Sequence, residues 1–337
     1  MKKHIACSVF ILLLLVSCGN SQQQKPLPEV RSGMDGLAME FVKNAPPAVI
    51  FESTSFPAIL RVKNIGAYSI SKDASAILSL AVERDYTIIT TLETSSRVEQ
   101  GSDKNEAKFS VEGKSIVNTK GDEEVISYTL TAGKLEPQSE THISNVIASI
   151  CYPYSTELVT SVCIDTDPNG LRPIKKSCSQ ENLPFSAGQG APVAITSIEV
   201  FMLPSADTQQ IVPQFYITIE NKGKGEVAHR NTFQQLCQRS ANPTQGSISY
   251  QDFNTLFITA SLSNEKLTCA LRDQASKLDP NEKEGIVRLK SKKDVVRCFG
   301  NPVNMLLEAY TAPLKVQLDY GYTQSLATEY TIRKPVR

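Results

Sequence analysis

One short segment of the chain carries oxygen ligands at the spacing used for calcium. Asp165, Asp167 and Asn169 alternate and precede Gly170, as in the first half of an EF-hand loop. The twelfth position of such a loop is a bidentate Glu, and here it is Lys176. We therefore interpret the segment as a turn after a strand. Ca²⁺ bound with the help of ligands from elsewhere in the chain is the alternative, and no other metal or cofactor is expected.

Six cysteines have the chemistry to form disulfides. Of the eight in the chain, Cys7 and Cys18 belong to the N-terminal segment described below, and the other six are Cys151, Cys163, Cys178, Cys237, Cys269 and Cys298. An even number in an exported protein predicts three disulfides, with fifteen possible pairings. Free buried thiols are the alternative, because a domain of this size can fold without disulfides.

The positions of two of these cysteines predict one bond. Cys151 and Cys163 are equidistant from Glu157, where we expect a β-hairpin turn, so they would lie opposite each other at a distance that suits a disulfide. Three of the six precede residue 185 and three follow it, so complete pairing needs an odd number of bonds between the two halves. We predict a Cys151–Cys163 bond and assign Cys178 to the bond that crosses.

Catalytic motifs are incomplete along the chain. Residues 112–115 end like a phosphate-binding loop, but Lys108 stands where the first Gly is needed. His142 and His229 follow the signal segment, and neither lies in a recognisable catalytic motif. We therefore predict no catalytic residue and no enzymatic activity. Paired carboxylates for glycoside hydrolysis are left open, because the sequence does not reveal which Asp or Glu face one another.

Four tyrosines occur as two alternating pairs, and they are Tyr152, Tyr154, Tyr320 and Tyr322. Their two-residue spacing favours packing in a core, since alternate residues of a strand point to the same side. A binding strip of tyrosines is the alternative, because the ring is apolar and its hydroxyl is polar. The absence of Trp argues against stacking on sugars.

The elements that must position these residues are strands. Alternating runs rich in Val, Ile, Thr, Phe and Tyr recur along the chain, for example at 58–63, 124–130 and 214–220. Clusters of Gly, Pro, Asn and Ser separate them. Only the segments around 232–239 and 266–277 have a helical pattern. The pattern predicts an all-β fold.

An internal repeat divides this β pattern into two copies. Residues 60–66 match 217–223 as an alternating strand closed by Asn-x-Gly, whose residues tolerate the positive φ of a tight turn. Residues 148–164 match 316–332 without a gap, and each is interpreted as the final β-hairpin of its copy. We infer a tandem duplication.

The first residues of the chain form an export signal. Lys2 and Lys3 precede an apolar run that is too short to span a bilayer, and the run ends in Leu-Val-Ser-Cys-Gly at Cys18. This sequence resembles the lipobox of prokaryotic lipoproteins, which implies cleavage before Cys18 and lipidation of its thiol. We expect residues 1–17 to be the signal peptide and 18–35 to be the lipidated Cys and a flexible tether. An ordinary signal peptide is the alternative.

The two copies resemble a known type of surface domain. The Asn-x-Gly strand and closing hairpin are similar to immunoglobulin-like sandwiches of the CARDB type, and the motifs at 151–156 and 162–165 resemble uncharacterised prokaryotic surface proteins with paired β domains. The resemblance implies two tandem immunoglobulin-like β-sandwich domains and no specific activity. We place them at 36–170 and 191–335, with a linker at 171–190.

Charge and composition limit the function. The chain has 35 basic and 35 acidic residues and lacks a basic run, so we expect no nucleic-acid partner. We predict a lipid-anchored cell-envelope protein with a binding, adhesion or assembly role. Its expected partners are the membrane, through the lipid, and an envelope or surface protein that contacts the insertions at 94–108 and 228–247. An extracytoplasmic hydrolase of glycan or peptide and a solute-binding lipoprotein with two α/β lobes are the alternatives.

Overall fold

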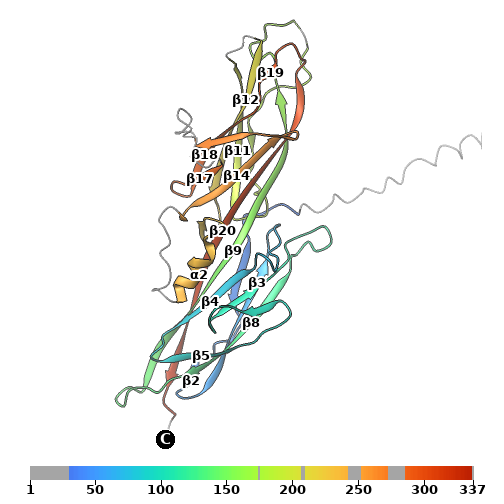
Figure 1. Ribbon diagram of the computed structural model, residues 1–337. Coiled ribbons are helices and arrows are strands. Elements are labelled where there is room, and N and C mark those ends of the chain that lie inside the picture. Colours follow the sequence, from blue (N-terminus) through green and yellow to red (C-terminus); the bar gives the residue numbers. More distant parts are fainter. Residues whose placement is uncertain (1–29, 174, 206–208, 242–251, 272–284, 336–337) are drawn as a thin grey trace, which may run out of the picture.

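The protein is built almost entirely from antiparallel sheets, which confirms the predicted all-β class. The computed structural model describes residues 30–335 except 174, 206–208, 242–251 and 272–284. Within them lie three sheets and one α-helix (Figure 1). The β/α lobes expected of a solute-binding lipoprotein are not seen in this part of the chain.

The first sheet lies in the lower half of Figure 1 and has the strand order β1-β3-β8-β5. Its strands are β1 (Leu37–Phe41), β3 (Ser55–Asn64), β5 (Thr87–Leu92) and β8 (Glu123–Ala132). In β3 the side chains of Phe56, Ala58, Leu60 and Val62 are buried and alternate with more exposed residues. The alternation read from the sequence therefore places one face of this sheet in the core.

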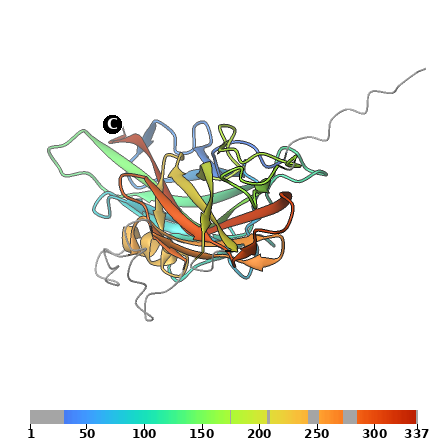
Figure 2. The same ribbon diagram turned by 90° about the horizontal axis from the view of Figure 1, so that it is seen from above.

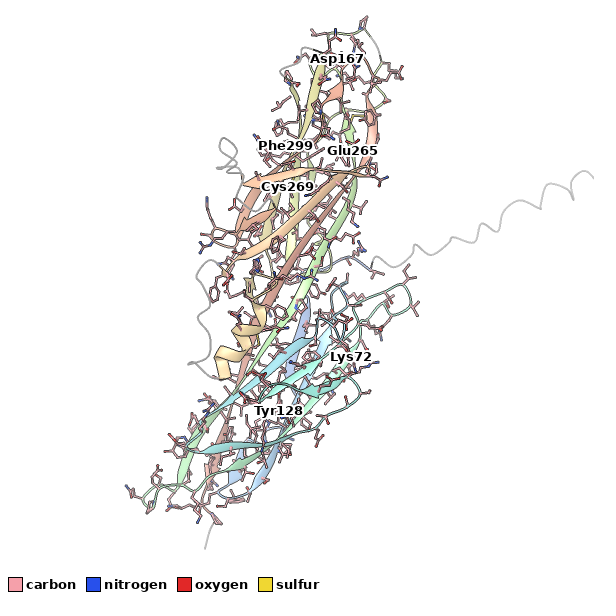
Figure 3. All side chains as sticks on the ribbon, in the orientation of Figure 1. Lys72, Tyr128, Asp167, Glu265, Cys269 and Phe299 are labelled. Carbon is pink, nitrogen blue, oxygen red and sulfur yellow. A yellow bond between two sulfur atoms is a disulfide. The ribbon has the colours of Figure 1, made fainter. Side chains whose placement is uncertain are left out.

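A second sheet repeats this arrangement in the upper half, in the order β10-β11-β12-β18-β16, with β19 paired to β12. Its strands are β10 (Leu183–Pro184), β11 (Val193–Pro204), β12 (Gln210–Asn221), β16 (Thr268–Leu271), β18 (Lys293–Phe299) and β19 (Val303–Asn304). The core is continuous through both halves. Tyr128 of β8 marks the lower part in Figure 3, and Cys269 of β16 marks the upper part.

A ten-stranded third sheet faces both of the others, in the order β15-β14-β20-β9-β4-β7-β6. Strands β2 and β13 also pair with β20, and β17 pairs with β14. Its strands are β2 (Val49–Phe51), β4 (Ala76–Val82), β6 (Val98–Gln100), β7 (Glu106–Phe109), β9 (Thr141–Ile164), β13 (Glu226–Ala228), β14 (Thr255–Leu262), β15 (Glu265–Lys266), β17 (Ile286–Arg288) and β20 (Tyr310–Arg333).

The two longest strands join the halves. Strands β9 and β20, of 24 residues each, pair along their whole length and run from one half to the other (Figure 1). The hairpin expected at Glu157 is therefore wrong: Glu157 lies within a continuous strand, opposite Gln317. The physical reason is that residues 154–162 contain no Gly, Asn or Asp to form a turn, and they continue the alternating strand pattern.

The pairing of the long strands follows the sequence repeat. Strand β4 pairs with Val146–Cys151 of β9, and β14 pairs with Leu314–Asp319 of β20. These two stretches are aligned by the repeat offset, since 146 + 168 = 314 and 151 + 168 = 319. The first part of each long strand thus lies beside a strand of its own copy, and the last part extends into the half of the molecule formed by the other copy. The limits 36–170, 171–190 and 191–335 remain predictions, and the third sheet is continuous across them.

One helix covers the outside of the third sheet. Helix α2 (Phe233–Ala241) contacts β4, β9 and β20 and lies at the side of the molecule (Figure 2). It confirms the helix predicted around 232–239. The helix predicted at 266–277 is wrong where the structure describes it, because β15 and β16 occupy residues 265–271. There the alternation around Cys269, which pairs with Cys298 of β18, determines the structure.

Candidate functional site

The four tyrosines meet at the centre of the molecule, where β9 crosses from one half to the other. Each is at most 1% exposed, which confirms the core interpretation. The ring centroids of Tyr152 and Tyr154 are 5.6 Å apart, and those of Tyr152 and Tyr322 are 5.7 Å apart. Burial raises the pKa of all four phenols, that of Tyr322 to about 12.

Two of these hydroxyls bind the Asn of the repeated Asn-x-Gly motif. Tyr154 Oη donates to Asn64 Oδ1 at 3.1 Å, and Tyr322 Oη donates to Asn221 Oδ1 at 3.1 Å. Both asparagines are buried, and their amide groups donate to nearby backbone carbonyls. The two motifs that the sequence analysis found separately are therefore parts of one contact, formed once in each half.

The Gly of the motif makes room for that hydroxyl. A Cβ atom at Gly66 would lie 1.9 Å from Tyr154 Oη, and one at Gly223 would lie 2.2 Å from Tyr322 Oη. Neither glycine has a positive φ, and neither do Asn64 and Asn221. The expectation that these residues serve a positive-φ turn is therefore wrong; the close approach of the tyrosine requires Gly.

The other two hydroxyls bind the first strand of each half. Tyr152 Oη accepts the backbone N–H of Leu37, and Tyr320 Oη accepts that of Val193, both at 3.3 Å. Thr156 Oγ1 lies 3.0 Å from Tyr320 Oη. All four phenols are thus engaged in hydrogen bonds that hold the fold together.

A groove opens beside the tyrosine cluster. It has a volume of about 380 Å³ and lies between β1 and the part of β20 that belongs to the first half. Its lining includes Leu37, Met39 and Leu326, with Asp35 and Lys224 also at the groove. Such a volume lies within the range of ligand sites. We use the name waist groove for the hollow lined by Asp35, Leu37, Met39, Lys224, Gln324, Ser325 and Leu326. No local sequence pattern indicates this groove, because it brings together strands about 290 residues apart.

All six predicted cysteines are disulfide-bonded, as Cys151–Cys237, Cys163–Cys178 and Cys269–Cys298. The predicted Cys151–Cys163 bond is wrong, because twelve residues of straight strand separate the two by about 40 Å. The expected odd number of bonds between the halves is confirmed by Cys151–Cys237. Assigning Cys178 to that bond is wrong, since it joins Cys163 and both precede residue 185 in the sequence.

The disulfides indicate an extracytoplasmic compartment. The expected signal peptide and Cys18 lie outside the described residues. Among the residues that are described, there is no helix with the length and apolar character needed to cross a bilayer.

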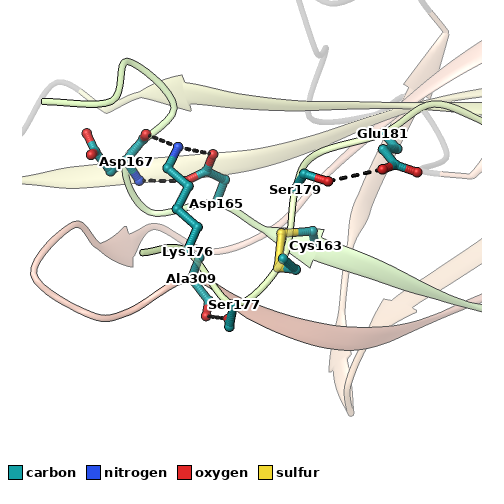
Figure 4. Close-up of a disulfide and its surroundings, with 9 residues drawn as sticks. Cys163, Asp165, Asp167, Lys176, Ser177, Ser179, Glu181 and Ala309 are labelled. Atoms are coloured by element: carbon teal, nitrogen blue, oxygen red, sulfur yellow. Dashed lines mark hydrogen bonds and ion pairs between the residues drawn. A yellow bond between two sulfur atoms is a disulfide. The ribbon is translucent and has the colours of Figure 1, made fainter. Parts of the chain in front are cut away.

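A lysine lies at the calcium-like loop (Figure 4). Lys176 Nζ is 2.6 Å from Asp165 Oδ2 and 2.5 Å from the backbone oxygen of Asp167. The Asp167 carboxylate accepts the N–H groups of Arg172 and Leu171, which lower its pKa. Asn169 is exposed at the turn. In the described chain, no three His, Cys, Asp or Glu residues form a metal-binding group. The ammonium group of Lys176 therefore lies against the oxygens that a bound Ca²⁺ would need. The segment is a turn stabilised by this ion pair.

One group of acidic and basic side chains was not foreseen. His142 Nε2 lies 2.8 Å from Glu83 Oε2, and the His142 ring stacks on Tyr86 with 3.6 Å between centroids. Tyr86 Oη donates to Glu136 Oε1 at 3.0 Å. The hydrogen bond from His142 lowers the pKa of Glu83. This group joins the turn after β4 to the start of β9. Glu83 and Tyr86 are 50 or more residues from their partners Glu136 and His142, so the four do not form a sequence motif.

Neither a protein-family model nor a curated protein matches the chain. Among solved structures, it is similar to the cohesin module of a Clostridium perfringens family 33 glycoside hydrolase, with 15% identity, a TM-score of 0.22, and 36% of this chain and 83% of that one covered. It is also similar to a DUF4466 family protein from Parabacteroides merdae, with 10% identity, a TM-score of 0.19, and 84% and 99% covered. The C-terminal domain of the Streptococcus agalactiae AgI/II polypeptide BspA has 7% identity, a TM-score of 0.18, and 88% and 98% covered. At these TM-scores the similarities carry no argument about function.

Proposed function

We propose that this protein is a lipid-anchored component of the cell envelope that binds another envelope or surface protein and catalyses no reaction. The observation that carries the proposal is the waist groove. It combines the apolar side chains of Leu37, Met39 and Leu326 with the charged side chains of Asp35 and Lys224, while the hydroxyl of its lining residue Tyr322 is engaged with Asn221. Such a surface is suited to holding a partner.

The frame around the groove supports this role. The third sheet is continuous through both halves, and the Cys151–Cys237 disulfide fixes α2 on it. Of the two insertions predicted to contact partners, 94–108 contains β6 and most of β7 at the sheet edge. The other insertion, 228–247, contains α2. The first insertion remains a candidate contact surface, whereas the described part of the second is packed on the sheet.

Site-specific cross-linking on intact cells tests the binding role. A photoreactive amino acid at the exposed Ser325, beside the groove, is expected to form an adduct with a partner protein. The matched control is Ile88 in β5, which is also exposed but lies in the first sheet. Equal adducts at both positions, or none at Ser325, would argue against the waist groove as the binding site.

The lipid anchor has its own test. Metabolic labelling with an alkyne analogue of palmitate is expected to label the wild-type protein and to place it in the membrane fraction. The Cys18→Ala variant should be unlabelled. Equal labelling of the two proteins would contradict anchoring at Cys18.

A further inference from the structure

The outer edge of β20 has a gap between its neighbouring strands. One edge of β20 pairs with β9 throughout. On the other edge, β14 pairs with residues 314–319, β13 with 321–323 and β2 with 331–333. In the described part of the chain, residues 324–330 have no partner strand on that edge. The gap begins at the waist groove, which Gln324, Ser325 and Leu326 line.

The backbone groups in the gap can be assigned a direction. The N–H of Thr331 donates to Ala48, and the carbonyl of Arg333 accepts from Glu52, so odd-numbered residues here direct these groups away from β9. Backbone groups alternate along a strand, so the N–H and C=O of residues 325, 327 and 329 also point away from β9. Within the described chain, no backbone hydrogen bond to these outward groups is found. An unpaired edge of this kind is a template for an added strand.

The side chains beside the gap fit an added strand. Leu326 is half-buried, and Leu37 and Met39 of β1 lie across the groove from it. Gln324 Nε2 donates to the Leu37 carbonyl at 2.7 Å, which joins the two sides. A strand placed along β20 would direct every second side chain into this partly apolar space and the others to solvent.

The length of the gap limits what can enter it. Seven residues span about 23 Å, and β13 and β2 close the two ends. The β20 edge of a second copy cannot fill the gap, because that strand is longer and carries its own β13 and β2 on the same edge. A short extended segment that enters and leaves between the two strands does fit.

We propose that the outer edge of β20 at residues 324–330 accepts an extended peptide segment of a partner protein as an added β-strand. The added strand would be about five to seven residues long and would carry apolar side chains at alternate positions. This inference rests on the proposed binding function and names the chemical form of the partner.

Selection of peptides against the full chain tests the inference. A phage-displayed library of random dodecapeptides is expected to yield ligands with alternating apolar residues. The Ala327→Pro variant removes one outward N–H and keeps the hydrogen bonds to β9, since proline is tolerated where the N–H faces away from its neighbour strand. It should weaken binding at least tenfold, whereas the control Ala327→Ser should not. A library without ligands, or ligands that bind Ala327→Pro equally well, would overturn the proposal.

Hydrogen exchange provides a readout without a substitution. In the wild-type protein, the selected peptide is expected to slow exchange at the amides of Ser325, Ala327 and Glu329. Protection confined to other strands would overturn the proposal even if Ala327→Pro failed to fold. If photo-cross-links form at Ser325 on cells but no peptide adds to this edge, the binding function stands and the strand-addition inference fails.

Discussion

Pro153 of β9 lies directly opposite Gly321 of β20 at the centre of the third sheet. On either side of this pair, Tyr152 faces Tyr322 and Tyr154 faces Tyr320, so the two copies are related by an approximate twofold axis. A Cβ atom at Gly321 would lie 2.3 Å from Cβ of Phe233, so the lack of a side chain at Gly321 also lets the start of α2 pack against β20. Beyond this central pair, each copy contributes the last part of its long strand to the half of the molecule formed by the other copy.

The Tyr–Asn hydrogen bonds should contribute equally in both halves. Tyr154→Phe and Tyr322→Phe each remove a buried hydroxyl donor from an Asn, although Asn64 Oδ1 still accepts the Gly66 N–H. The loss of each hydrogen bond is expected to lower the free energy of unfolding by about 0.5–1.5 kcal/mol. Urea denaturation measures this change. Tyr310→Phe is the control, because Tyr310 is exposed at the start of β20. A loss in one half only would show that the two contacts are not equivalent.

A side chain at Gly66 should clash with the Tyr154 hydroxyl and also with the backbone oxygens of Gly190 and Asp35, which would lie 2.5 and 2.7 Å from the new Cβ atom. Gly66→Ala is expected to destabilise the protein by about 1–3 kcal/mol through overpacking. The loss should be smaller in a Tyr154→Phe background, where the nearest of the three clashing oxygens is absent. The matched control is Gly300→Ala, whose new Cβ would meet only Leu267 Cδ2, at 3.1 Å. Strict additivity of the Gly66 and Tyr154 substitutions would contradict this explanation.

The disulfide that joins the two halves of the sequence should stabilise the fold more than the short one within the first half of the sequence. Cys151 and Cys237 are 86 residues apart, and Cys163 and Cys178 are 15 apart. Loop-closure entropy gives about 4–5 kcal/mol for the first bond and about 3 kcal/mol for the second. Unfolding of the two double Cys→Ala variants in urea compares them. The opposite order would show that α2 is held mainly by packing.

The ion pair at Glu157 should give a pH-dependent stability. Arg31 lies 2.8 Å from Glu157, and its hydrogen bond lowers the pKa of that carboxyl. A lowered folded-state pKa means that the stabilisation is complete above the unfolded value of about 4.3 and is lost as the pH falls through the folded value. Arg31→Met should therefore destabilise the protein at pH 7 and leave it unchanged near pH 2. The same difference at both pH values would exclude this ionisation as its cause.

The strands and the tyrosine core could be predicted from the sequence because alternation is a local signal. In β3, Phe56, Ala58, Leu60 and Val62 mark the buried face without any knowledge of the partner strands. The repeat likewise singled out both the Asn-x-Gly motif and the paired tyrosines. Their contact could be recognised only once Tyr154 and Asn64, 90 residues apart, were placed together.

The exchange of strands could not be predicted in this way. A hairpin at Glu157 and a straight strand through it have the same alternating pattern, so alternation alone does not distinguish them. The signal against the hairpin was the lack of Gly, Asn and Asp in residues 154–162. The error in the Cys151–Cys163 bond followed from that choice. The waist groove was missed for the same reason, because Leu326 reaches Leu37 only when β20 returns to the first half.

The distance along β9 tests the exchange of strands most directly. Spin labels at Ile147→Cys and Ser161→Cys, both exposed positions of β9, can be measured by pulsed electron resonance in a protein whose native cysteines remain bonded. A straight strand predicts a separation of about 46 Å between the two backbone positions. A hairpin turning at Glu157 would bring them to about 20 Å, and that result would contradict the exchange.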